Sequence, residues 1–111
     1  MFIASRFEIE KQELTDLVTK QVLVGPKQGW DSHVMRLFTL KQGGKAPHHA
    51  HPWQHIIYAL EGEGNLMMDG KDYPLHPHTT AYVPQDIIHQ ISNAGEGNFV
   101  FICIVPEYGD R

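Results

Sequence analysis

Histidine is concentrated in one stretch of this chain, Gly43-Gly44-Lys45-Ala46-Pro47-His48-His49-Ala50-His51-Pro52-Trp53-Gln54-His55. His49, His51 and His55 are separated by two and by four positions, and side chains an even number of positions apart share one face of an extended strand. If Pro52 ends the strand, His55 reaches the other two across a turn instead. Neutral imidazole is a suitable ligand for Zn, Cu, Fe and Ni, so the spacing predicts a metal site in either arrangement.

The alternative is a solvated histidine run that binds metals only adventitiously. This run, however, lies in mid-chain, begins with the Gly43-Gly44 loop and precedes the apolar segment 56–60. A loop that leads into an apolar strand is the setting of a folded site rather than of a low-complexity tract. The surroundings therefore favour a site that is built into the fold.

The chain has 111 residues, a formal net charge of -4 and a single cysteine, Cys103. This length suits one domain, residues 1–111, whose core is modest enough that an oligomeric interface is expected. The absence of a basic block argues against nucleic acid and anionic membranes as partners. No apolar segment approaches the ~20 residues of a membrane span, and we expect no signal peptide. With one cysteine, which suits a reducing compartment, these features predict a cytoplasmic protein.

Short alternating or apolar runs, separated by Gly and Pro, predict β-strands along most of the chain. The expected strands are residues 21–24, 32–40, 56–60, 65–68, 71–75, 80–83, 88–92 and 99–105. Asp69-Gly70 is a strong hairpin signal, because both central residues of a type I′ turn need φ > 0. The pattern predicts an all-β barrel or sandwich.

The two ends of the chain carry weaker patterns. Residues 7–10 alternate like a strand, and residues 10–18 suit a short helix with few apolar positions. Pro106 ends the last apolar run, so we expect residues 107–111 to form a solvated tail.

Two segments of the chain resemble the motifs of the cupins, a family of jelly-roll β-barrels. The first cupin motif reads Gly, five residues, His-x-His, three or four residues, Glu, six residues and Gly. This spacing is met by Gly43, His49, His51, His55 and Gly62, with His55 at the glutamate position. The resemblance therefore begins in the histidine stretch itself.

The second cupin motif reads Gly, five residues, Pro-x-Gly, two residues, His, three residues and Asn. This spacing is met by His78, Pro84, Asp86, His89 and Asn93. His78 and Asp86 replace the two glycines, which serve turns, and Asp tolerates such backbone conformations. We therefore expect the cupin fold to be retained, with its core motifs over residues 43–93.

The all-histidine set is similar to that of small, single-domain cupins that often contain manganese. This resemblance implies a jelly-roll barrel that forms a homodimer, with N-terminal strands in residues 1–24 used in dimerisation. It also implies a divalent transition metal in the barrel lumen, with Mn favoured, then Fe, Zn or Ni. The implied ligands are His49, His51, His55 and His89.

Four neutral imidazoles would leave the charge of a divalent ion uncompensated, so the ion would polarise a carbonyl group strongly. A six-coordinate ion would keep two positions open, whereas tetrahedral Zn²⁺ would be saturated by the same four ligands. We therefore predict a dioxygenase-like oxidoreductase that acts on a small organic substrate. The alternatives are a metal-assisted isomerase or lyase and a non-catalytic module that binds a metal or a small ligand.

Arg36 and Cys103 are the candidates for further groups in the lumen. Arg36 shares strand parity with Val34 and Phe38, which predicts either an inward charge for a substrate carboxylate or an ion pair at the barrel mouth. Cys103 shares parity with Phe101 and faces either the metal or simply the apolar core. Trp53 and Tyr58 either line the pocket or pack against it. The segments around the ligands contain no paired carboxylates, so no second catalytic group is evident.

Overall fold

The computed structural model describes residues 1–46 and 49–110, and nearly all of its regular structure is β-strand. The predicted all-β fold is confirmed, because each of the eight strands expected between residues 21 and 105 has a counterpart. Nine strands are found in the described residues: β1 (Gln12–Thr15), β2 (Val18–Val24), β3 (His33–Leu40), β4 (His55–Glu61), β5 (Gly64–Met68), β6 (Lys71–Leu75), β7 (Thr80–Val83), β8 (His89–Asn93) and β9 (Phe99–Pro106).

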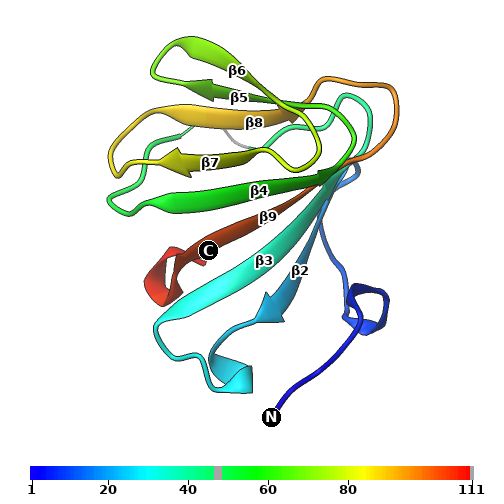
Figure 1. Cartoon of the computed structure of the whole chain (residues 1–111), viewed down its shortest axis with the longest axis vertical. Coiled ribbons are helices and arrows are strands. Elements are labelled where there is room, and N and C mark those ends of the chain that lie inside the picture. Colours follow the sequence, from blue (N-terminus) through cyan, green and yellow to red (C-terminus); the bar gives the residue numbers. More distant parts are fainter. Residues whose placement is uncertain (47–48, 111) are drawn as a thin grey trace.

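The strands form two antiparallel sheets (Figure 1). The larger sheet has the order β1-β2-β3-β9-β4-β7, and the smaller has the order β6-β5-β8. The last strand, β9, pairs with β3 on one side and with β4 on the other. The end of the chain therefore lies in the interior of the larger sheet, which also contains the first strand. This position explains the almost uninterrupted apolar run of β9, whose residues are mostly buried.

The core lies between the two sheets. Inward-facing residues of the larger sheet, such as Ile57 and Phe101, pack in one cluster with Leu66 and Ile91 of the smaller sheet. The side-chain period of two along each strand sends these residues inward and their neighbours outward. One cluster of this kind is what a single small domain requires.

Two residues that replace cupin glycines lie in the backbone conformation that glycine favours. His78 has φ 70° and Asp86 has φ 65°. Asp69 and Gly70 likewise have φ values of 52° and 78°, which confirms the predicted hairpin between β5 and β6. The turns are therefore kept although two glycines are lost, in agreement with the tolerance of Asp for this region.

The structure corrects two predictions for the N-terminal residues. The segment expected as a strand at 7–10 contributes to a 3₁₀ turn, η1 (Arg6–Glu8), and the short helix expected at 10–18 is replaced by β1 and the start of β2. Ser5 and Glu8 form a capping box, in which the Ser5 Oγ accepts from Phe7 N–H (3.2 Å) and the Glu8 carboxylate accepts from Ser5 N–H (2.8 Å). The Ser-x-x-Glu spacing carried this signal in the sequence.

The C-terminal segment is not a solvated tail. It forms a second 3₁₀ turn, η3 (Glu107–Gly109), and Gly109 is buried against the Trp53 indole. In Figure 1 this turn lies beside the end of β9. Long-range contacts that no local pattern encodes hold it there.

A further 3₁₀ turn, η2 (Pro26–Gln28), links β2 and β3. No helix among the described residues is long and apolar enough to cross a membrane.

Candidate metal and substrate site

A β-bridge brings the two histidine motifs together. His49 N–H donates to the His89 carbonyl (3.1 Å) and His89 N–H donates to the His49 carbonyl (2.9 Å). Asp86 N–H donates to the His51 carbonyl at 2.6 Å, which ties the same loop to the turn before β8. Backbone bonds, rather than the side chains themselves, therefore place the first motif next to the second.

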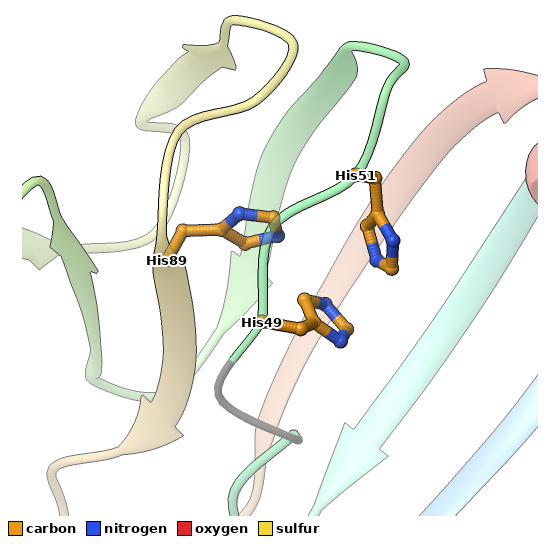
Figure 2. Close-up of side chains that lie close together, drawn as sticks. All are labelled: His49, His51 and His89. Carbon is orange, nitrogen blue, oxygen red and sulfur yellow. The ribbon is translucent and has the colours of Figure 1, made fainter.

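The imidazoles of His49, His51 and His89 converge on one region of space (Figure 2). One potential ligand atom from each of the three lies within 4.8 Å of the others. The ring centroid of His49 lies 3.9 Å from that of His51 and 4.8 Å from that of His89. Three of the four predicted ligands thus form one group.

The fourth predicted ligand, His55, lies next to this group but is not one of the three whose ligand atoms converge. Its ring centroid is 4.9 Å from that of His89 and 5.2 Å from that of His51. Its Nε2 is buried and has no hydrogen-bond partner in the part of the chain that is described. A buried nitrogen in this condition is rare in native proteins and calls for an explanation.

Hydrogen bonds orient two of the rings. The Nδ1 of His89 lies 2.9 Å from the Ile87 carbonyl, which only accepts, so Nδ1–H donates and Nε2 keeps its lone pair. The Nδ1 of His55 lies 3.3 Å from the Cys103 sulfur. This arrangement, with the outer nitrogen bound by the protein, is the usual one for histidines that ligate metals.

The environment favours the neutral form of two of these imidazoles, those of His51 and His55. Burial, followed by the charges of His89 and Arg36, lowers the pKa of His55 to about 3. Burial and the same two neighbours also lower the pKa of His51. Neutral imidazole is the form that binds a metal, so the site is prepared for a cation at neutral pH.

The four histidines line a cavity of about 530 Å³. Its walls are mainly apolar, with Val18, Phe38 and Phe101 from the larger sheet and Ile91 from the smaller one. Trp53, which also lines it, stacks on His51 at a centroid distance of 4.4 Å. A mostly apolar cavity with a few polar groups is typical of a site for a small organic molecule.

Arg36 and Cys103 both line this cavity, while Arg36 also forms an ion pair with Asp110 and Cys103 also belongs to the apolar core. They are directly opposite one another on β3 and β9, and the Arg36 guanidinium donates to the Cys103 sulfur at 3.2 Å. Burial raises the pKa of the Cys103 thiol although the Arg36 charge opposes that shift. Cys103 therefore stays protonated and is a contact between Arg36 and His55 rather than a nucleophile.

The sequence analysis missed two charged residues beside Arg36. Asp110 accepts from Lys20 Nζ at 2.9 Å and from Arg36 at 3.4 Å. Lys20 and Arg36 are 8% and 6% exposed, so both cations are almost buried. No local signal identifies Asp110, because its partners lie 74 and 90 positions earlier in the chain.

His33, His76, His78 and Tyr58 are not among the residues that line the cavity. His33 stacks on Trp30, His76 pairs with Glu63, and the Tyr58 hydroxyl contacts His78. His48 lies outside the described residues.

The chain belongs to the cupin family: residues 36–105, more than half of the chain, match the family described as "Cupin domain". This match joins the Arg36 strand, both histidine motifs and β9 in one unit. The predicted fold class and family are therefore confirmed.

Three similar proteins have names that mention enzymes or synthases. The polyketide synthase CurC of Streptomyces cyaneus is 29% identical over 85 residues, which are 76% of this chain and 52% of that protein. This chain therefore spans about half the length of that relative.

The polyketide cyclase RemF of Streptomyces resistomycificus has a similar structure, with a TM-score of 0.89 and 23% identity over 96% of this chain and 80% of that one. A Thermotoga maritima protein described as a predicted oxalate decarboxylase has a TM-score of 0.85 and 20% identity over 95% and 98% of the two chains. The two structural likenesses concern the fold alone.

Proposed function

We propose that this cupin holds a divalent transition metal on His49, His51 and His89, with His55 as a fourth ligand, and acts on a small organic carbonyl compound. The observation that carries the proposal is the convergence of three imidazoles, from two separate motifs, in the wall of a mostly apolar cavity. Mn, the metal implied by the resemblance to small single-domain cupins, is the first expectation, followed by Fe, Zn or Ni; the affinity order of divalent ions does not by itself select Mn.

The donor set fits such an ion on two counts. Burial and the neighbouring charges of His89 and Arg36 lower the pKa of two of its imidazoles, His51 and His55, and the buried Nε2 of His55 has no partner among the described residues. A cation bound nearby would satisfy that nitrogen. When bound, the metal would supply Lewis acidity toward a carbonyl oxygen.

The residues of the chain have their own parts in this proposal. Ile87 and Cys103 orient the outer nitrogens of His89 and His55. Phe38, Phe101 and Trp53 exclude water and present flat apolar surfaces to a substrate.

Metal-assisted chemistry on a carbonyl compound, such as enolisation, is the reaction that we place first. The support is the name of the Streptomyces cyaneus relative, since polyketides are chains rich in carbonyl groups. The dioxygenase-like oxidation, the homodimer with its N-terminal strands and the cytoplasmic location stay predictions.

The first experiment measures metal content by mass spectrometry in purified wild type, His51→Ala and His89→Ala, with His76→Ala as the control because His76 is exposed and pairs with Glu63. We expect metal in wild type and the control and its loss from the two site variants. Full retention of metal in both site variants would refute the assignment.

The second experiment follows exchange of the central methylene protons of pentane-2,4-dione in deuterated water by NMR, together with O₂ uptake. Faster exchange with the metal-loaded wild type than with the metal-free protein supports enolisation. O₂ uptake with oxidised product would support the oxidoreductase instead. If the protein produces neither faster proton exchange nor O₂ uptake, the non-catalytic binding module is supported.

A further inference from the structure

A charged cluster with an excess of positive charge lies beside the histidines: Arg36 lines the cavity and donates to the Cys103 sulfur, which also contacts His55. Two nearly buried cations, Lys20 and Arg36, share the single carboxylate of Asp110. Of the described residues that line the cavity, none carries a carboxylate. Buried charges are normally paired, so this cluster has room for one more anionic group.

The unfilled capacity is on Arg36. Its guanidinium has five N–H donors, and among the described residues it donates only to Asp110 and to the weakly accepting Cys103 sulfur. The Asp110 contact is long at 3.4 Å, and the buried Nε has no partner. A guanidinium left in this state favours a ligand that brings strong acceptors, and carboxylates match its fork geometry.

The surrounding rings hold this guanidinium at the cavity wall. Its Cζ lies 5.0 Å from the centre of the Phe38 ring, and Phe38 in turn stacks on Phe101 at 5.2 Å. All three residues line the cavity. An orienting aromatic surface and the exclusion of water both strengthen a bond between Arg36 and an anion.

We propose that Arg36 determines substrate specificity by binding the carboxylate of a small keto acid, whose carbonyl group faces the histidines. The carbonyl half of this inference rests on the proposed function, whereas the carboxylate half rests on Arg36 alone. The class of substrate is thus an anion with an acidic group at one end and a carbonyl group away from it.

Asp110 sets the strength of this interaction. Its contact with Lys20 (2.9 Å) is shorter than its contact with Arg36 (3.4 Å), so it can stay paired with Lys20 while the ligand occupies Arg36. Removal of the Asp110 charge leaves both cations without a carboxylate. The affinity for an anionic ligand should then rise.

The test uses two probes that differ in charge but hardly in shape, 4-oxopentanoate and 4-oxopentanamide. Their dissociation constants are measured by calorimetry with chelator-treated and with metal-loaded protein. In the chelator-treated protein we expect the carboxylate to bind at least about tenfold more tightly than the amide, in line with charged hydrogen bonds. Equal binding of the two probes by the wild type overturns the proposal.

Three variants locate the effect. Arg36→Gln should abolish the preference for the carboxylate, and Arg36→Lys should keep only part of it because the fork is lost. Asp110→Asn should raise the affinity for 4-oxopentanoate several-fold and leave that for the amide unchanged. Asp110→Asn keeps the side-chain size of a partly exposed residue, so this variant keeps the test valid even if Arg36→Gln does not fold.

Lys71→Gln is the matched control, because it removes one exposed positive charge on β6, away from the cavity. Its preference for 4-oxopentanoate over the amide should equal that of wild type. Lys45 is another cation in the cavity lining. If the preference for the carboxylate survives in Arg36→Gln, or disappears in Lys45→Gln instead, the assignment to Arg36 is overturned. The outcome with chelator-treated protein does not depend on metal content, so failure here and failure of the metal centre are distinguishable.

Discussion

Two polar groups meet at Cys103 and are held in opposite ways: the histidine end (His49, His51, His55 and His89) and the arginine end (Lys20, Arg36 and Asp110). At the histidine end, imidazole rings present ring nitrogens, and backbone groups position them through the His49–His89 bridge and the Ile87 carbonyl. At the arginine end, permanent charges present N–H donors, and side chains from separate elements position them. One end suits a cation and the other suits an anion.

This difference shows how a small barrel can recognise a molecule with two unlike ends. It also means that the ends respond to different perturbations. Protonation disables the histidine end, because a protonated imidazole cannot bind a metal. The arginine end keeps its charge but depends on the seating of the C-terminal turn, which carries Asp110. The following measurements test this contrast, beginning with the largest effect.

Metal affinity should separate the two ends most clearly. His55→Gln is expected to lower it by about 100-fold or more, since one ligand of the proposed set is lost. Arg36→Gln should leave it within about threefold or raise it, because a nearby positive charge is removed. Competition titration with a chromogenic chelator measures both. Equal losses in the two variants would mean that the ends are not independent.

The stability of the metal-free protein should fall in acid because of the histidine end. The pKa of His55 is about 3 in the folded state, against an ordinary value of 6.5. Between these two pH values the His55 imidazole is protonated in the unfolded chain but neutral in the folded protein. The contribution of His55 to the unfolding free energy therefore has its full value above pH 6.5 and decreases as the pH falls toward 3. Allowing for partial solvent screening, we expect a loss of about 2 kcal/mol from this group.

Urea unfolding at several pH values measures this loss. His55→Gln lacks the titrating group and should show a shallower pH dependence than wild type. A variant curve parallel to that of wild type would contradict the depressed pKa.

The seating of the C-terminal turn can be tested with a pair of glycines. A Cβ at Gly109 would lie 2.7 Å from Nε1 of Trp53, so Gly109→Ala must displace the turn or the indole. We expect a loss of about 1–2 kcal/mol in urea unfolding from this overpacking. Gly97→Ala is the matched control, because a Cβ there meets nothing within 4 Å. Equal stability of the two variants would show that the turn is only loosely held.

The contact between the two ends should have the smallest effect. Cys103 joins Arg36 to His55 through a weakly accepting sulfur. Cys103→Ser is therefore expected to change the unfolding free energy by less than about 1 kcal/mol and to retain the metal. The buried thiol, with its raised pKa, should react with a disulfide reagent only after unfolding. Rapid reaction in the native state would place the thiol in solvent.

Most of the fold was predictable from short-range patterns. Strands β3 to β9 follow from apolar alternation and from turn residues such as Asp69-Gly70, because the period of a strand and the φ of a turn are local properties. The N-terminal errors arose where pattern and pairing competed: residues 12–15 become an edge strand because β2 supplies their hydrogen-bond partners. The turn at Arg6–Glu8 was readable from its capping box but was overlooked.

The sequence by itself determined the family, the strand plan and the histidine group, since the residues of each motif are close in the chain and their spacing reflects local geometry. Only the tertiary structure decided the arginine end. There, Lys20, Arg36 and Asp110 meet over separations of 74 and 90 residues, and the position of His55 beside the main group depends on how β4 packs on β9. Contacts of this kind follow from the closure of the sheets, which brings together residues that no sequence spacing relates.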